Sequence, residues 1–579
     1  MKNIQDKEIL NEFNNSNFQN AYKLAKSIDI NIINEISLKI LIISSFRLKK
    51  FSECIKFSHK YLEVYKLKNN FDILNILGIS YSTLKEYENG NKFFKEILLY
   101  EPKNISVNYN LGFNLFKQKK YFEAKKVLIK VVTIKKWYQN SELLLGIINS
   151  ELKNFNEAIK IFTNLIENNK YTSEANYNLG IVYQTINKYE LSIIYFSKAI
   201  DINNKEERYY NSIGISYQKL FKFNEAEEAY NKAIKLNNHY TNPHINLGLI
   251  NQKKGLFKNA LKIYDAALKD NPNNSQILYN KSICLLESGN FKDGFKLYKW
   301  RQEGKFLKSS DFDLNGIKDK TIYITCDQGL GDIILLTRYV ILLSEYCAKI
   351  IFQIPKGMEE IMSFMNENIV ITSDLSNQSY DYICSLGDLF QVFKVNSDNI
   401  PMTKAPYFKI DKKWSLKWKS KLNTNKYNVG IAWQGKKGGI VDEGRSFELK
   451  NFEKISKLKG IQLVSLQKND GKEQITKFNE INNIINFDNE LDLEHKFIDT
   501  AGLMQNLDLV ISSDTSIVHL AGSLGIKTWL LVQKYPFWYW QLYNNKSIWY
   551  NSVKIFKQKE NSNWKKLFDQ IEQELMKEL

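Results

Sequence analysis

Small and bulky apolar residues recur through the first half of the chain with a constant period. Glycine returns every 34 residues and serine takes the next place in the series: Gly78, Gly112, Gly146, Gly180, Gly214, Gly248 and then Ser282. A small residue follows each of these by 12 positions, and a bulky one such as Phe94 or Tyr230 usually comes four positions later. A fixed period of this length predicts a repeat array of paired helices. Because glycine weakens a helix by about 1 kcal/mol relative to alanine, its retention predicts a close approach of the neighbouring helix.

The array begins with less regular units. Residues 17–21 and 51–55 have the pattern of second helices in two degenerate repeats, as expected of terminal units that face water. Pro102 and Pro272 lie at repeat ends, where proline stops a helix because it lacks a backbone donor. We therefore assign residues 1–305 to an α-solenoid of about eight or nine repeats. The spacing and residue types resemble tetratricopeptide (TPR) repeats.

After residue 320 the helical period gives way to short apolar runs. These runs predict strands at 321–325, 348–354, 369–372 and 380–384, and then at 427–433, 461–466, 484–486, 507–512 and 528–532. The first run is followed by a glycine turn and a helical pattern from Ile333, which is the opening of a Rossmann-like fold. The pattern restarts after a helical connector. Two Rossmann-like lobes are therefore expected, at residues 316–415 and 427–535, with a ligand in the cleft that the strand carboxyl ends line.

The composition and net charge of the chain exclude few classes of function. The chain has 579 residues, too many for one core, and 81 Lys and Arg against 63 Asp and Glu give a net charge of +18. The basic residues are not gathered into a stripe, so we expect no nucleic-acid partner. Scattered cysteines without a CxxC pair favour reduced thiols in a cytoplasmic protein. No apolar run is long enough to predict a membrane span, and no signal core opens the chain.

No metal site is predicted. The five histidines are not spaced as zinc ligands. Asp311-Phe312-Asp313 has the Asp-x-Asp pattern of metal-dependent glycosyltransferases, but it precedes the first strand instead of ending one, so we interpret it as surface charge.

Five short motifs in the second half carry a resemblance to an enzyme family. They are Gln328-Gly329-Leu330-Gly331-Asp332, the run from Gly430 to Gly435, Arg445-Ser446, the run from Ser465 to Lys468, and the run from Asp514 to Gly522. Their order and spacing, over about residues 316–560, resemble the heptosyltransferase family of glycosyltransferases, in the branch fused to TPR arrays. The resemblance implies the two-lobed GT-B architecture and metal-independent, inverting transfer. It implies a nucleotide-sugar co-substrate, of unidentified base and sugar, and no other cofactor.

Asp332 is the candidate catalytic base. It follows the acceptor-side loop of Gln328, Gly329 and Gly331, and the corresponding aspartate of the resembled family is proposed to take the proton of the acceptor hydroxyl. An aspartate at the start of a helix is also an ordinary cap for free backbone amides, and the sequence leaves that role open.

The donor is expected at the start of a helix in the second lobe. Asp514, Thr515 and Ser516 open this helix, whose free amides and positive dipole suit the phosphates of the donor. His519 lies one turn later and would hydrogen-bond a phosphate or sugar oxygen. Alternatively, Asp514, Thr515 and Ser516 only cap the helix, and His519 is an ordinary buried histidine.

Further donor-binding candidates follow two strands. Gln434, Gly435, Lys436 and Arg445 belong to the loop after residues 427–433, and Gln467 ends the next strand. Lys436, Lys437 or Arg445 would neutralise the leaving group, with solvated surface charge as the alternative. Gln467 is expected to meet the nucleotide base or ribose.

Asparagine occupies the sixth position of four repeats, on the helix expected to face the groove: Asn110, Asn178, Asn246 and Asn280. Side-chain amides offer donors and acceptors to a peptide backbone, and a comparable ladder belongs to the O-linked N-acetylglucosamine transferases, which this domain order resembles. Asparagine is also the usual TPR consensus residue at this position, so the four asparagines are alternatively explained by the repeat structure alone.

Aromatic residues crowd positions 535–540, and Trp549 and Tyr550 follow. They are able to stack on a sugar or a membrane interface. Several of these residues recur in the resembled family, and we expect residues 536–579, an aromatic segment and a helix, to pack back on the first lobe.

The leading hypothesis is a cytoplasmic glycosyltransferase whose TPR array presents a protein acceptor. The alternative is a non-catalytic TPR interaction scaffold with a vestigial transferase domain. A lipopolysaccharide-core heptosyltransferase is disfavoured, because a small lipid acceptor does not need a long solenoid.

Overall fold

The structure is a computed structural model. It describes residues 2–65, 70–302, 312–374, 379–396, 399–400, 406–436, 444–540, 545–560 and 563–579. Contacts within the chain define two compact units, Met1–Pro243 and His244–Leu579. The division falls inside helix α15 (Thr241–Lys253), so the last helices of the repeat array belong to the second unit.

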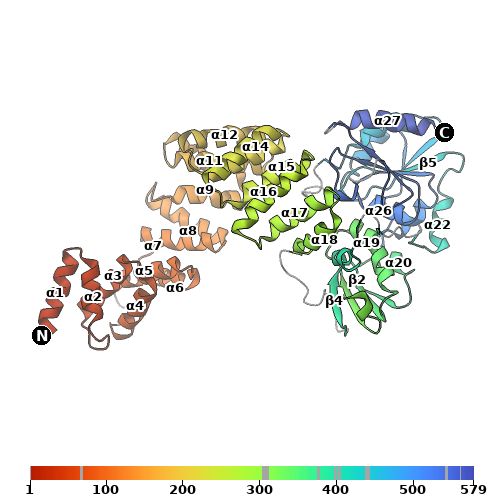
Figure 1. The fold of residues 1–579 in the computed structure, drawn as a ribbon. Coiled ribbons are helices and arrows are strands. Elements are labelled where there is room, and N and C mark those ends of the chain that lie inside the picture. The colour runs from red at the N-terminus through yellow and green to blue at the C-terminus, as the bar shows by residue number, and fades with distance from the viewer. Residues whose placement is uncertain are drawn as a thin grey trace. The chain divides into compact units, whose positions relative to one another are not determined.

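Paired antiparallel helices make up the repeat array (Figure 1). In the first unit they are α1 (Lys2–Asn14), α2 (Phe18–Lys26), α3 (Glu35–Arg47), α4 (Phe51–Tyr65), α5 (Phe71–Thr83), α6 (Tyr87–Tyr100), α7 (Ile105–Lys117), α8 (Tyr121–Ile134), α9 (Ser141–Glu151), α10 (Phe155–Glu167), α11 (Thr172–Thr185), α12 (Tyr189–Ile202), α13 (Glu207–Lys219) and α14 (Phe223–Leu236). After α15 come α16 (Phe257–Asp270), α17 (Ser275–Glu287), α18 (Phe291–Tyr298) and the 3-10 turn η1 (Lys299–Gln302). The two degenerate repeats expected at the start contain α2 and α4.

The periodic glycines lie where paired helices touch. A Cβ atom on Gly180 of α11 would lie 2.6 Å from ring carbons of Phe196 on α12. Gly214 of α13 faces Tyr230 of α14 at the same 2.6 Å. Both rings are fully buried. The period therefore repeats one contact, in which a ring of the second helix, or the Leu128 side chain at Gly112, lies against the bare backbone of the first.

Two parallel sheets follow the array, and the elements around them define a first and a second lobe. The sheet of the first lobe has the order β3-β2-β1-β4 and contains β1 (Thr321–Thr325), β2 (Lys349–Gln353), β3 (Ile369–Thr372) and β4 (Tyr382–Ser385). The sheet of the second lobe has the order β10-β9-β8-β5-β6-β7 and contains β5 (Tyr427–Ala432), β6 (Ile461–Ser465), β7 (Ile484–Asn486), β8 (Leu509–Ser513), β9 (Thr528–Val532) and β10 (Val553–Lys557).

Each strand expected from the sequence is present, but the expectations miss β10. This edge strand exposes two lysines, at positions 554 and 557, so it lacks the continuous apolar run of its neighbours. Parallel pairing with β9 extends the second sheet beyond the expected boundary at residue 535.

Short helices and turns cover the sheets. In the first lobe they are η2 (Leu314–Gly316), α19 (Leu330–Leu343), α20 (Glu359–Met362), η3 (Leu386–Asp388) and α21 (Leu389–Val392), and α22 (Lys412–Lys419) connects the lobes. In the second lobe they are η5 (Leu449–Phe452), α23 (Glu453–Ser456), α24 (Gln474–Asn479), α25 (Ile498–Met504), α26 (Ser516–Ser523), η6 (Trp538–Trp540) and α27 (Trp564–Met576).

The second sheet separates two hydrophobic cores. Successive residues of β6 and β8 face opposite sides, so Val464 and Val510 enter one core while Leu463 and Leu509 enter the other. The core with the two valines continues into the first lobe and into α17 and α18 of the last repeat. One buried core therefore unites the last repeat, the first lobe and one face of the second sheet.

The aromatic segment before β10 packs as expected, but the final helix does not. Trp538 lies 5.6 Å from Phe295 of α18 and 5.7 Å from Phe390 of the first lobe, measured between ring centroids. Phe568 of α27 lies instead 5.1 Å from Phe447, in the core of the second lobe. The expectation that α27 returns to the first lobe is wrong, because its apolar face covers the opposite side of the second sheet.

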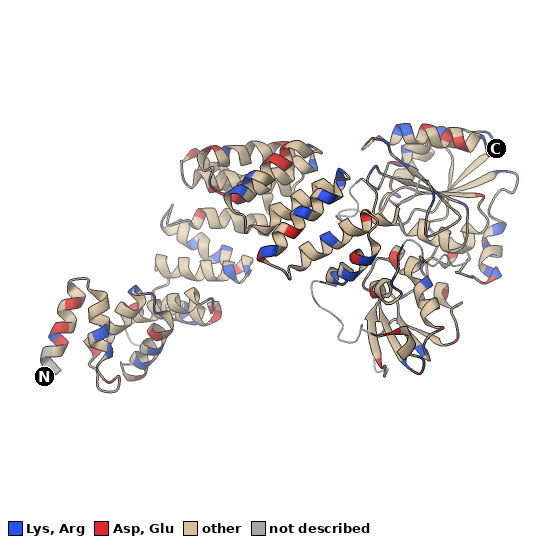
Figure 2. Ribbon diagram, in the orientation of Figure 1, with Lys and Arg blue, Asp and Glu red and all other residues tan. Residues whose placement is uncertain are grey.

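Charged residues of both signs are interspersed along the described helices of the array (Figure 2). Among the described helices, none is both long enough and apolar enough to cross a membrane. Within the same described ranges, no three His, Cys, Asp or Glu side chains converge as metal ligands. Asp313 accepts the backbone N–H of Asn315 at 3.2 Å and so opens η2, whereas Asp311 lies outside the described residues.

We predict that Gly180→Ala destabilises the array. In an isolated helix the change would stabilise by about 1 kcal/mol, but here the added Cβ collides with Phe196, and overpacking of this kind costs about 1–3 kcal/mol. Urea unfolding followed by circular dichroism should give a lower midpoint than wild type. Thr185→Ala, on the exposed side of the same helix, is the matched control and should leave the midpoint nearly unchanged. A higher midpoint for Gly180→Ala would contradict the close contact.

Candidate functional site

The starts of α19 and α26 meet at Gly331. A Cβ atom on this glycine would lie 3.3 Å from the Cα of Ser516 and 2.9 Å from the imidazole Cδ2 of His519. Helix α19 follows β1 and α26 follows β8, so the contact joins the carboxyl ends of strands in the two sheets. The structure thus brings the acceptor-side loop and the donor helix expected from the sequence to one place.

Asp332 lies in the first turn of α19, at this contact, and is partly buried. Its Oδ2 accepts the backbone N–H of Gly329 at 3.1 Å, so it does cap the helix. Burial, with a smaller contribution from the charge of Asp514, raises the pKa of Asp332 to about 6 against the opposing effects of the Tyr539 hydroxyl and the Gly329 amide. A carboxyl group with this pKa is largely ionised at neutral pH and still able to accept a proton.

The start of α26 has no side-chain cap. Thr515 occupies the N-cap position, but its hydroxyl lies 3.2 Å from that of Ser512 instead of bonding the first amides of the helix. These amides and the positive end of the helix dipole suit an anion. Burial raises the pKa of Asp514, and the Trp540 indole and the Arg445 charge oppose the shift.

His519 is buried in aromatic surroundings. Its Nδ1 lies 3.1 Å from the Tyr550 hydroxyl, and its ring lies 5.3 Å from that of Trp540. Burial, assisted by the charge of Arg338, lowers the pKa of His519 to about 3. The imidazole is therefore neutral near pH 7 and offers a ligand a hydrogen bond but no charge.

Arg445 approaches this region across Gly435. A Cβ atom on Gly435 would lie 2.5 Å from Arg445 Nη2, and the Gly435 N–H donates to the Ser446 hydroxyl at 3.0 Å. Arg445 also lowers the pKa of Asp514, so its positive charge acts at the start of α26. Lys436 is exposed, and Lys437 lies outside the described residues.

Hydrogen bonds engage the side chains of Gln434 and Gln467 with the backbone of nearby loops. The side-chain N–H of Gln434 donates to the Gly435 carbonyl at 3.1 Å, and the residue lines an open cavity of about 680 Å³ near the start of α27. Gln467 Oε1 accepts the backbone N–H groups of Trp433 at 2.9 Å and Gln434 at 3.0 Å. Its Nε2 donates to the carbonyls of Gln434 and Asp470, both at 2.8 Å. The Gln467 amide is thus saturated and shapes this loop, a different role from the expected contact with a nucleotide.

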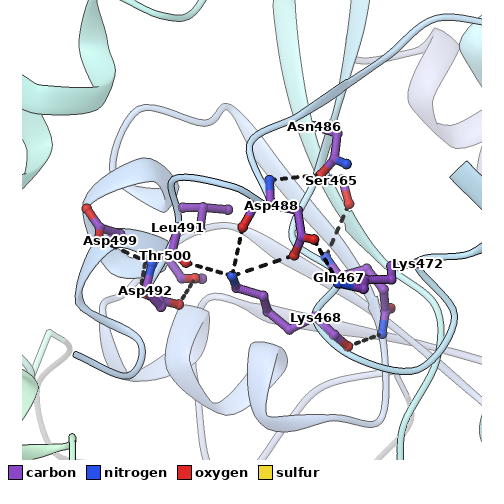
Figure 3. Close-up of polar contacts among 10 residues, drawn as sticks. All are labelled: Ser465, Gln467, Lys468, Lys472, Asn486, Asp488, Leu491, Asp492, Asp499 and Thr500. Atoms are coloured by element: carbon purple, nitrogen blue, oxygen red, sulfur yellow. Dashed lines mark hydrogen bonds and ion pairs between the residues drawn. The ribbon is translucent and has the colours of Figure 1, made fainter. Parts of the chain in front are cut away.

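Polar side chains near Gln467 also bond one another (Figure 3). Lys468 Nζ donates to the carbonyl of Leu491 at 2.6 Å, and Lys472 forms an ion pair with Asp488 at 2.9 Å. Hydrogen bonding to Lys472 is the main cause that lowers the pKa of Asp488. These contacts bind the loops after β6 and β7 together.

The four asparagines of the expected peptide groove are divided between the units. Asn110 and Asn178 belong to the first unit, and Asn246 and Asn280 to the second. The side-chain N–H of Asn178 donates to the carbonyl of Glu174 in its own helix at 2.7 Å. Asn280 is buried and accepts from Gln276 at 3.2 Å. The peptide groove stays a prediction.

Sequence reasoning missed three residues near Asp332 and one, Arg301, that contacts Asp327 in the segment before it. Tyr539 belongs to the aromatic run, but nothing local indicates that its hydroxyl influences the pKa of Asp332. Tyr279 and Tyr298 belong to helices of the last repeat, and Arg301 to the turn that follows them, so their positions in the sequence do not indicate contacts with the first lobe. No signal in the sequence identifies them, because their partners are distant along the chain.

We predict that Asp332→Asn stabilises the second unit at neutral pH. The pKa of Asp332 is about 6 in the folded protein, against an ordinary value of 3.8. Protonation of Asp332 therefore stabilises the fold fully below about pH 4, and this stabilisation is lost as the pH rises through 6. Asparagine keeps the cap without the charge, so the variant should unfold about 2–4 °C above wild type at pH 8, and the difference should vanish towards pH 4.

Differential scanning calorimetry at several pH values measures this difference. Asp319→Asn, at an exposed position, is the control and should show no pH-dependent gain. A variant less stable than wild type at pH 8 would mean that the Asp332 carboxylate is chiefly a stabilising cap.

Comparison with known families supports the assignment of the array. Tetratricopeptide repeat profiles match residues 173–206, 207–240 and 245–299. No curated protein sequence matches the chain.

Solved structures are similar to parts of the chain. A crystal structure of MamA protein is 24% identical, covering 29% of this chain and 93% of its own, with a TM-score of 0.27. A tetratricopeptide repeat protein from Parabacteroides merdae is 17% identical, covering 43% of this chain and 98% of its own, with a TM-score of 0.35. YrrB, a TPR protein with an unusual peptide-binding site, is 16% identical, covering 32% of this chain and 97% of its own, with a TM-score of 0.27. Residues 173–240 and 245–299 are TPR repeats, and the N-terminal region is a solenoid of this type.

Proposed function

We propose that residues 316–560 form an inverting, metal-independent glycosyltransferase of the GT-B type, and that the TPR repeats bind its protein acceptor. The observation that carries the proposal is the contact at Gly331. It joins a carboxyl group that is able to act as a base to a helix start that is able to hold a diphosphate.

The proposed donor site is the start of α26. The diphosphate of a nucleotide sugar would accept hydrogen bonds from the free amides after Thr515, and Arg445 would add a positive charge as the leaving group departs. His519, which is neutral, would donate or accept one hydrogen bond without adding charge. The negative charge of Asp514 favours a donor whose sugar hydroxyls, rather than its phosphates, face that carboxylate.

Asp332 is the proposed base. Its carboxylate takes the proton from the acceptor hydroxyl while the acceptor oxygen bonds to the anomeric carbon, and the bond from that carbon to the diphosphate breaks. Attack from the face opposite the diphosphate inverts the anomeric centre. The proton remains on Asp332 until solvent removes it, which its pKa of about 6 permits at neutral pH.

The repeats supply the proposed acceptor site. TPR repeats commonly bind protein or peptide partners, and in this chain they continue into the unit that contains Asp332. A peptide held by the last repeats would be bound by the same unit as Asp332, and the asparagine amides are the groups proposed to hold its backbone.

We expect Asp332→Asn to bind donor but not to transfer sugar. Titration calorimetry with UDP-glucose, UDP-N-acetylglucosamine, GDP-mannose and ADP-heptose should identify a donor for the wild type. The variant should bind it within about threefold and turn it over at least a hundredfold more slowly, since general-base catalysis contributes about 10²–10⁴. Asp319→Asn is the matched control and should behave as wild type.

The pH dependence of the wild type tests the base independently. Because Asp332 must be ionised, kcat/KM should rise about tenfold per pH unit below 6 and level off above it. Full activity of Asp332→Asn, or binding of none of these donors by the wild type, would overturn the proposal and leave a TPR interaction protein.

A further inference from the structure

The last repeat is built into the first lobe. Phe295 of α18 stacks on Phe390 of α21, with ring centroids 4.4 Å apart and planes 11° apart. Tyr298, at the end of the same helix, is 3% exposed and belongs to the core that extends through the first lobe. Helix α17 contacts both η1 and η6. The repeat and the lobe therefore form a continuous packed structure within the second unit.

Arg301 of η1 lies at the centre of this junction and its side chain is 6% exposed. Its Nε donates to Asp327 at 2.6 Å and its Nη2 to Asp388 at 2.9 Å. Nη1 donates to the backbone carbonyl of Tyr298 at 3.1 Å, and Nη2 also contacts the hydroxyl of Ser385. The guanidinium group thus donates hydrogen bonds both to the last repeat and to the first lobe.

The two acidic partners of Arg301 lie in loops at the carboxyl ends of neighbouring strands. Asp327 follows β1, and Asp388 lies in η3 after β4. Gly387 makes room for the arginine, since a Cβ atom there would lie 2.8 Å from the guanidinium carbon. Buried ion pairs with several hydrogen bonds define geometry strongly, because either partner left alone would be an unpaired buried charge.

Asp327 lies in the short connection between β1 and α19, and Asp332 lies in the first turn of α19. Only Gln328, two glycines and Leu330 separate them, so Asp327 lies on the short path by which the chain enters α19. The hydroxyl of Tyr279 on α17 lies close enough to Asp332 for their charges to interact. Burial raises the pKa of Tyr279, and the charge of Asp332 adds to this rise.

We propose that Arg301, a residue of the repeat array, is a positioning residue that holds the Asp332 loop in its reactive geometry through Asp327. It acts on a site that the proposed function makes catalytic, so the inference rests on that function for its chemical consequence. The last repeat accordingly supports the segment before Asp332 as well as belonging to the array.

Hydrogen exchange tests the positioning directly, whether or not the chain is an enzyme. In Arg301→Met, amides of residues 326–332 should exchange at least about tenfold faster than in wild type, and Arg301→Lys should restore part of the protection. Arg208→Met is the matched control, because Arg208 is a repeat arginine of the first unit that pairs with Glu206. It should leave exchange in residues 326–332 unchanged.

A second variant separates positioning from the cost of unpaired charge. Arg301→Met combined with Asp327→Asn and Asp388→Asn contains no orphaned carboxylate, so it should recover the thermal stability of wild type. Its loop should still exchange fast. Recovery of slow exchange in this triple variant, or unchanged exchange in a folded Arg301→Met protein, would overturn the inference.

Measurement of turnover provides a quantity that would not change if Arg301 had a merely structural role. With a donor identified for the wild type, Arg301→Met should lower kcat at least about tenfold and change the donor KM less than about threefold, because the start of α26 is untouched. A rise in KM with unchanged kcat would contradict positioning of Asp332. If wild type turns over no donor, the proposed function fails, and hydrogen exchange alone decides the inference.

Discussion

The candidate site depends on how closely α19 approaches α26. Each helix begins at the carboxyl end of a strand, and the two strands belong to different sheets. Their starts meet because position 331 has no side chain: a Cβ there would lie 3.3 Å from the Cα of Ser516. Two positive helix ends therefore converge, and they bring the carboxyl groups of Asp332 and Asp514 together. Burial raises the pKa of both carboxyl groups, and the charge of Asp514 adds to the rise at Asp332, which is the unfavourable feature of the arrangement.

The aromatic segment after β9 stabilises that approach. Arg338 of α19 is fully buried and donates to the carbonyl of Trp549 at 2.8 Å. Its guanidinium lies 4.8 Å from the centroid of the Tyr550 ring, a distance at which cation–π attraction is effective. Trp538 meanwhile packs against the last repeat and the first lobe. The segment is an internal part of the unit, and its Tyr539 hydroxyl helps to compensate the charge of Asp332.

The sequence predicts most local elements correctly because their causes are local. Apolar runs mark the central strands, which are buried on both faces, and the glycine period marks helix pairs that touch. Errors occur where an element takes its place from distant partners. Strand β10 has exposed lysines and is held by pairing with β9, and α27 gives no local sign of which lobe its apolar face covers. Gln467 has the residue type of a ligand contact, but the surrounding backbone uses its entire amide.

By itself, the sequence determined the repeat period, the alternation of strands and helices, and the presence of helix starts near Asp332 and Ser516. These follow from spacing over a few residues, which sets backbone conformation and the face of each element. Tertiary structure alone decided which groups surround Asp332. Arg301 reaches Asp388 across 87 positions and Arg338 reaches Trp549 across 211, and contacts at such separations depend on packing that no local pattern records. The chemistry available at the site is therefore a property of the assembled second unit.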